Sequence, residues 1–114
     1  MRVLVGPENL EVRLARWQKV AGLLRDITVP RASITDVSVL EEAVSQAMGT
    51  GPKVGLRIPW LYYVARTIKL DEAFIVRRGV PALCVAVDGE GPLKRLLLST
   101  REAQQLAERL RSAP

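Results

Sequence analysis

The sequence predicts a mainly β domain that ends in one amphipathic helix, which places it in the α+β class. Short runs in which apolar and polar residues alternate occur along much of the chain, and this period of two is typical of strands with one buried face. Glycine, proline, asparagine and aspartate separate the runs, as they do in turns. The clearest helical periodicity lies in the last stretch, after residue 99.

The front half of the chain predicts four strands. Residues 2–5 and 10–14 alternate in period two around a turn at 6–9, so they predict a β-hairpin. Residues 26–29 form a short run that Pro30 ends. Residues 34–39 predict a further strand, with a bulge at the irregular step between Ile34 and Val37.

Two stretches of the front half are less regular. In residues 15–24, Trp17, Val20, Ala21 and Leu24 fall at helical spacing and predict an apolar stripe along one side of a helix. Because Gly22 weakens a helix, one to three helical turns and a bent strand both remain open. Residues 40–48 permit a helix, and the glycines and prolines of residues 49–59 predict the longest loop.

The second half predicts four strands and the terminal helix. The strands cover residues 61–68, 73–77, 81–87 and 93–98, with turns at 69–72, 78–79 and 88–92. Ser99 and Glu102 have the spacing of a capping box, which predicts the start of the helix. Its apolar face is formed by Ala103, Leu106, Ala107 and Leu110.

These elements predict seven or eight short antiparallel strands in meander order, capped by the helix. Two orthogonal sheets, or a partly open barrel plugged by the helix, would cover the exposed strand edges. A chain of 114 residues fits one domain, residues 1–114. The positions predicted to be buried are Leu10, Val12, Leu14, Val85, Leu96, Leu98, Leu106 and Leu110.

The composition argues against catalysis. The chain has no histidine and a single cysteine, Cys84, so no histidine-based triad can form within it and zinc has almost no suitable ligands. We therefore expect no catalytic residue, no metal and no cofactor. Cys84 lies in an apolar run and is predicted to be a small core residue in a reduced, intracellular setting. A cytoplasmic location follows as a prediction.

The net charge of +5 is spread along the chain without a dense basic block. A weakly basic solvated surface is the favoured interpretation, and a dedicated anion site is the alternative. Basic and aromatic residues do not interleave, so nucleic-acid binding is not expected. The uncharged runs fall well short of the ~20 residues of a membrane helix, and the first residues do not form a secretory leader, so no transmembrane segment is predicted.

Two residue sets remain as candidate binding sites. The first is the aromatic cluster Trp60, Tyr62 and Tyr63, which predicts an interface, with core and rim packing as the alternative. The second is a basic set that can bind an anion if neighbouring strands bring it together, with solvated strand-end charges as the alternative. Its members are Arg66, Arg77, Arg78, Lys94 and Arg95.

Several motifs also resemble those of a known family. They are Gly55-x-x-x-Pro59, Phe74-x-Val76-Arg77-Arg78-Gly79-x-Pro81-Ala82-Leu83-x-Val85, Lys94-Arg95-Leu96-Leu97-Leu98-Ser99, Trp17 and Ile34-x-x-Val37-x-Val39. In this pattern the chain is similar, over nearly its whole length, to small bacterial proteins with a pleckstrin-homology-like fold. It departs from them at residues 69–72, where members usually carry glycines. The resemblance implies a barrel with one open end, used for phospholipid head groups, peptides or self-association. It implies no activity.

Together these observations predict a non-catalytic binding or assembly module. The favoured partner is a protein or a second copy of the chain, bound through the aromatic cluster or an exposed strand edge. The alternative is an anionic ligand or phospholipid head group, bound at the periphery of the inner face of a membrane.

Overall fold

The computed structural model describes residues 1–22, 24–44, 53–58, 61–67, 71–89 and 93–111. Within these residues the chain forms nine strands, two α-helices and one short 3-10 helix. In chain order the elements are β1 (Arg2–Val5), β2 (Asn9–Arg13), α1 (Arg16–Gly22), β3 (Ile27–Pro30), η1 (Arg31–Ser33), β4 (Ile34–Leu40), β5 (Lys53–Ile58), β6 (Tyr62–Thr67), β7 (Glu72–Arg77), β8 (Ala82–Val87), β9 (Arg95–Ser99) and α3 (Ala103–Arg111).

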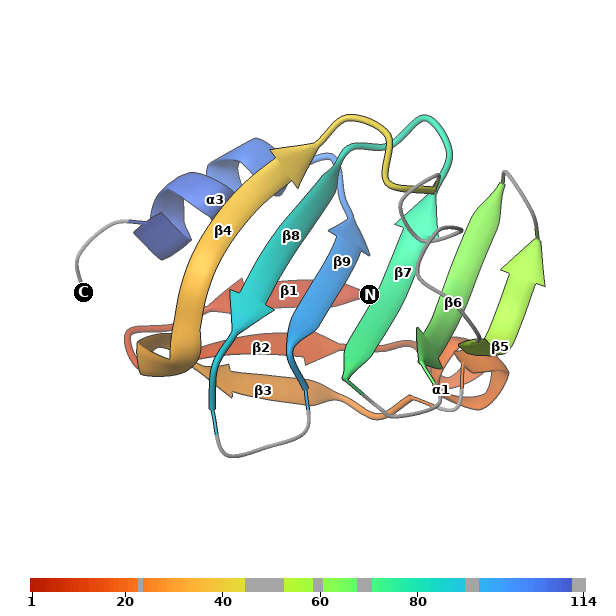
Figure 1. Cartoon of the computed structure of the whole chain (residues 1–114), viewed down its shortest axis with the longest axis horizontal. Coiled ribbons are helices and arrows are strands. Elements are labelled where there is room, and N and C mark those ends of the chain that lie inside the picture. The colour runs from red at the N-terminus through yellow and green to blue at the C-terminus, as the bar shows by residue number, and fades with distance from the viewer. Residues whose placement is uncertain (23, 45–52, 59–60, 68–70, 90–92, 112–114) are drawn as a thin grey trace.

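The strands build two sheets that pack face to face (Figure 1). The smaller sheet has the order β1-β2-β3 and is antiparallel throughout. The larger sheet has the order β4-β8-β9-β7-β6-β5, and its strands run across those of the smaller sheet. Helix α3 lies beside β4 at one side of the molecule, and α1 packs near β5 and β6 at the other. Among the described residues no helix has the length and apolar character needed to cross a membrane.

The main core lies between the two sheets. Leu10 and Val12 from β2 meet Val85 from β8 and Leu98 from β9, and Leu106 joins them from α3. Of the eight positions predicted to be buried, seven are buried, which confirms their assignment to inner faces. Leu110 is half-buried, because it lies in the last turn of α3 where the helix leaves the sheet.

A second apolar cluster covers the outer face of the larger sheet. Phe74 and Val76 of β7 and Leu97 of β9 pack there with Ala43 and Val44, which follow β4. Strands β7 and β9 are therefore buried on both faces. This explains why Leu96, Leu97 and Leu98 form a continuous apolar run rather than an alternating one.

The predicted class is confirmed in its coarse form, mainly β with a C-terminal helix, but the strand order needs correction. The described residues contain nine strands rather than seven or eight, and the two sheets do not close into a barrel. Strand β9 inserts between β7 and β8, so β7 and β9 run parallel and the set is not wholly antiparallel. The meander prediction was wrong at this point, because each strand was assumed to pair with its neighbour in the sequence.

Strand β5 lies where the sequence predicted a loop. Gly55 adopts a φ of 131° within this strand, a conformation that only glycine reaches easily, and its pairing with Ala65 of β6 is intact. The predicted bulge in β4 is confirmed by a register shift between Ile34 and Asp36. The helix-permissive stretch at residues 45–48 lies outside the described residues.

The start of α3 also differs from the predicted capping box. Ser99 belongs to β9, and its Oγ accepts a hydrogen bond from the Arg77 backbone N at 2.8 Å. Thr100 caps the following turn, because its Oγ1 accepts from the Glu102 backbone N at 3.2 Å. The Ser99 hydroxyl therefore links β9 to the end of β7, and the Thr100 hydroxyl is the cap.

Candidate interaction surface and cavity

Helix α1 presents part of its predicted apolar stripe to solvent. Trp17 is 52% exposed and Val20 is 71% exposed, whereas Leu24, just after the helix, is buried in the main core. The polar Gln18 is only 5% exposed, and its Oε1 accepts a hydrogen bond from the Ala15 backbone N at 3.0 Å, which caps the first turn. The helical spacing was predicted correctly, and the structure divides the stripe between solvent and core.

Trp17 is part of a larger exposed apolar surface. Its ring lies 6.1 Å from that of Tyr62, and Ile58 is the cross-strand partner of Tyr62. Leu61 lies in the adjoining turn, where its backbone N donates to the Ile58 carbonyl at 3.0 Å. Val20 lies one helical turn from Trp17 on the same side of α1. We call the four exposed residues Trp17, Val20, Ile58 and Leu61 the apolar surface.

Arginines border the apolar surface. Arg16 precedes Trp17 on α1, and the Arg78 backbone N donates to the Leu61 carbonyl at 2.9 Å. Arg57 lies opposite Tyr63 and therefore on the other face of β5. The side chains of Arg16 and Arg78 are exposed, and neither forms an ion pair with a carboxylate of the described residues. The rim of the surface is therefore cationic.

The nearest carboxylate on the α1 side is already paired. Asp26 Oδ1 accepts a hydrogen bond from the Leu14 backbone N at 2.8 Å, and its Oδ2 lies 3.4 Å from Lys19 Nζ. The Leu14 backbone hydrogen bond is the main cause that holds the pKa of Asp26 below its usual value; desolvation, the next largest effect, opposes it, and the Lys19 side chain adds a further lowering. Asp26 is therefore a structural carboxylate that fixes the start of the α1 segment.

The predicted aromatic cluster is divided by the structure. Trp60 lies outside the described residues. Tyr62 is half-buried and contacts Trp17, whereas Tyr63 points to the opposite face of the sheet and is buried in the second apolar cluster. Tyr62 thus borders the apolar surface, and Tyr63 is a core residue.

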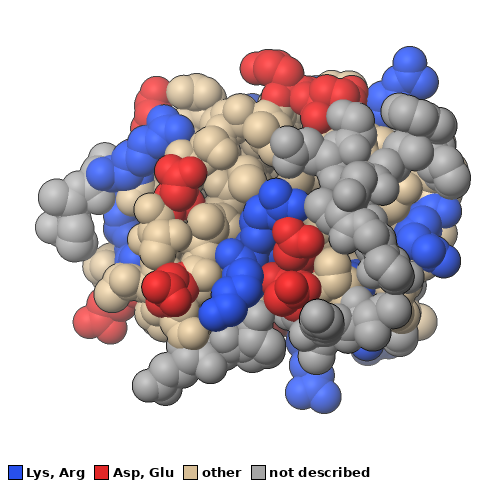
Figure 2. Space-filling model, viewed as in Figure 1, with Lys and Arg blue, Asp and Glu red and all other residues tan. Residues whose placement is uncertain are grey.

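The predicted basic set does not converge on one site. Because β7 and β9 are parallel, Arg77 and Arg78 lie at the far end of β7 while Arg95 lies opposite Glu72 at its near end. Five residues of strand separate these ends by about 16 Å. Lys94 precedes Arg95, and Arg66 of β6 lies opposite Ala73, so both belong to the near end. On the face shown in Figure 2, Lys and Arg side chains lie interspersed with Asp and Glu side chains.

Arg95 is occupied by a carboxylate. Its Nε lies 2.6 Å from Glu72 Oε1, and both side chains are largely buried. The N–H does not point at the oxygen, so the contact is an ion pair without hydrogen-bond geometry. An external anion would have to displace Glu72. We therefore do not assign Arg95 to an anion site.

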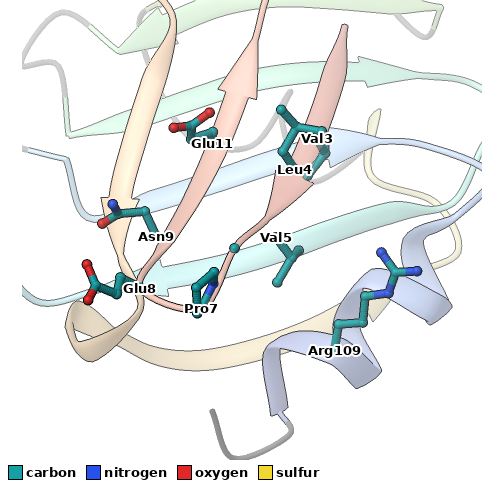
Figure 3. A pocket seen from close by; sticks show the side chains of 9 residues that line it. Val3, Leu4, Val5, Pro7, Glu8, Asn9, Glu11 and Arg109 are labelled. Carbon is teal, nitrogen blue, oxygen red and sulfur yellow. The ribbon is translucent and has the colours of Figure 1, made fainter.

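A hollow of about 440 Å³ lies over the β1–β2 hairpin. Figure 3 shows Arg109 projecting from α3 on one side, with Glu8, Asn9 and Glu11 on the other. The side chains are of mixed charge and come mostly from one hairpin. Arg31 closes the base, because its guanidinium donates to the carbonyl oxygens of Gly6 at 3.1 Å and Arg109 at 2.9 Å. The hollow does not offer a convergent set of donors or acceptors.

A second cavity, of about 290 Å³, opens at one end of the space between the sheets. We call it the end cavity. It is lined by Met1, Gln18, Tyr62, Ile75, Val76, Arg77, Val80, Ser99, Thr100 and Arg101. The charged side chains among these lining residues are two guanidiniums, Met1 adds the N-terminal ammonium, and no carboxylate is among them. Of the predicted basic set, only Arg77 takes part.

Among the described residues no group of carboxylates and cysteine is arranged to hold a metal ion. Cys84 is partly exposed and packs against the second apolar cluster. No family model, curated protein or solved structure matched the chain.

Several residues of the two sites were missed by the sequence analysis. Ile58 and Leu61 carry no signal of exposure, because an apolar residue beside a turn is equally typical of a core edge. For Gln18 the sequence pattern pointed the other way. A polar residue beside Trp17 is expected on the solvent side of an amphipathic helix, but here Gln18 is buried and Trp17 is exposed. Arg101 follows Thr100, the residue that caps the turn before α3. From this position a side chain can reach the end of a sheet.

Proposed function

We propose that this domain is a non-catalytic binding module that makes a protein–protein contact through the apolar surface. The observation that carries the proposal is the exposure of Trp17 and Val20 on α1 beside Ile58 and Leu61. Removing this hydrophobic area from water against a partner would be favourable. Tryptophan and arginine, the residue types of this surface and its rim, are enriched at interface hot spots.

The resemblance to bacterial pleckstrin-homology-like proteins supports the same proposal, since that fold serves binding and assembly. Two packed sheets with a C-terminal helix agree with it, and the parallel β7–β9 pair departs from the expected antiparallel order. A cytoplasmic setting is part of the proposal and follows from the lone Cys84.

The first experiment measures the molar mass by light scattering over a wide range of protein concentration. We expect the wild type to pass from monomer towards dimer and Val20→Asp to remain monomeric. Val20 is 71% exposed, so its replacement should leave the fold intact. Gln104→Asp introduces the same charge at an exposed position on α3 and should follow the wild type. A wild type that stays monomeric throughout would contradict self-association.

A second candidate function is contact with an anionic membrane surface, and the unpaired arginines of the rim favour it. Exposed tryptophan and aliphatic side chains surrounded by cations suit the lipid–water interface. Added salt distinguishes the two candidates, because it should weaken membrane binding and strengthen self-association. Screening weakens the attraction of Arg16 and Arg78 to anionic vesicles, whereas it relieves their mutual repulsion across a protein dimer. Sedimentation with phosphatidylserine vesicles that is lost in high salt would favour the membrane.

A further inference from the structure

The end cavity brings together donors from four separate parts of the chain. Gln18 comes from α1, Tyr62 from β6, Arg77 from β7, and Thr100 and Arg101 from the turn that leads into α3. These segments lie far apart in the sequence and meet only because β9 is inserted beside β7. The arrangement is a property of the complete fold.

Gln18 contributes an amide donor to this cavity. The residue is 5% exposed, and its Oε1 accepts a hydrogen bond from the Ala15 backbone N at 3.0 Å. That bond fixes the side chain at the cavity wall. Its amide nitrogen forms no hydrogen bond within the described residues and is not a buried atom without a partner, so it is accessible from the cavity. A ligand can therefore accept from it without displacing a protein group.

The charges around the cavity select an anion. The exposed residues Arg77 and Arg101 both line it, and neither forms an ion pair with a carboxylate of the described residues. The Arg77 backbone N is already bonded to Ser99 Oγ, so the side chain rather than the main chain is available to a ligand. A guanidinium fork matches the two oxygens of a carboxylate.

The volume of the end cavity and its apolar lining residues indicate what the uncharged part of the ligand is. A volume of about 290 Å³ lies just below the range of about 300–1,000 Å³ that holds drug-sized ligands. The rings and aliphatic groups of Tyr62, Ile75 and Val80 line the same space. We propose that the end cavity binds a small monocarboxylate with an apolar body, its carboxylate held by Arg77, Arg101 and the Gln18 amide. Tyr62 borders both this site and the apolar surface, but none of the four residues of the apolar surface lines the cavity, and the proposal goes beyond the protein contact.

Phenylacetate is a suitable probe, and isothermal titration calorimetry measures its binding. We expect saturable one-to-one binding to the wild type. Arg77→Gln should weaken it about tenfold or more, because a charge-assisted hydrogen bond is lost. Arg78→Gln removes the same charge one residue away, outside the cavity, and should change the affinity less than about twofold. Gln18→Glu keeps the oxygen that accepts from Ala15, replaces the amide donor by an acceptor, and should abolish binding.

Circular dichroism melts of the same variants show whether each one is folded. Absence of binding to the folded wild type would overturn the proposal, and so would equal losses in Arg77→Gln and Arg78→Gln, which would indicate diffuse attraction. Phenyl phosphate binding more tightly than phenylacetate would overturn the carboxylate assignment. The protein contact is tested independently, because Val20→Asp leaves the cavity lining unchanged.

Discussion

Leu106 anchors the C-terminal helix to the core, and its truncation tests that docking. The side chain is 3% exposed and packs in the cluster between the sheets with Ala103 and Ala107 of the same helix. Leu106→Ala removes three buried carbon groups, which costs about 2.4 kcal/mol at about 0.8 kcal/mol per methylene. The cavity left behind adds to this, so we expect a total loss of about 3–4 kcal/mol.

Urea unfolding followed by circular dichroism measures the effect. With a slope of about 1–3 kcal/mol per molar urea, the midpoint should fall by about 1–4 M while the slope stays unchanged. Two variants on the same helix serve as controls. Gln105→Ala is exposed and should be close to neutral, and Leu110→Ala is half-buried and should fall between the two. A midpoint for Leu106→Ala equal to that of Gln105→Ala would refute the docking of α3.

Two further predictions concern local structure. The pKa of Asp26 is lowered by the Leu14 backbone hydrogen bond, so its charge contributes stability above about pH 4 that is lost as the pH falls through the lowered pKa. Asp26→Asn should therefore melt below the wild type at about pH 6 and alongside it at about pH 2 in thermal scans. Thr100→Ala removes the cap of the Glu102 backbone N and should cost about 0.5–2 kcal/mol in chemical unfolding, whereas Thr100→Ser should retain most of it.

Local periodicity predicted most elements of the fold. Strand β2 alternates strictly because one face meets the core, and Leu10 and Val12 are fully buried as that pattern requires. The irregular step after Ile34 predicted a bulge because a period-two pattern cannot skip a residue without one. These features depend on neighbouring residues alone, so the sequence is sufficient to find them.

The pairing of strands and the candidate sites depend on distant residues. Alternation shows which face of a strand is buried but not which strand lies beside it, so the parallel β7–β9 pair left no local signal. Gly55 hid β5 because glycine is read as a breaker, although here it supplies a φ that the strand requires. The exposure of Trp17 was missed because a helical stripe has the same spacing whether it faces a core or a partner.

The position of β9 also has a kinetic consequence. Strands β4 and β8 pair across more than forty intervening residues, and the centre of the larger sheet is completed only when residues 95–99 enter between β7 and β8. The β5–β6–β7 hairpins can form early at one edge, but β4 and β8 join them only through β9, the last strand of the described residues. Contacts between residues this far apart in the sequence cost chain entropy before they stabilise the sheet, so we expect refolding on the scale of about milliseconds to seconds rather than microseconds. During synthesis the facing edges of β7 and β8 stay unpaired until β9 has been made, and a chaperone that shields extended segments would find its binding site there.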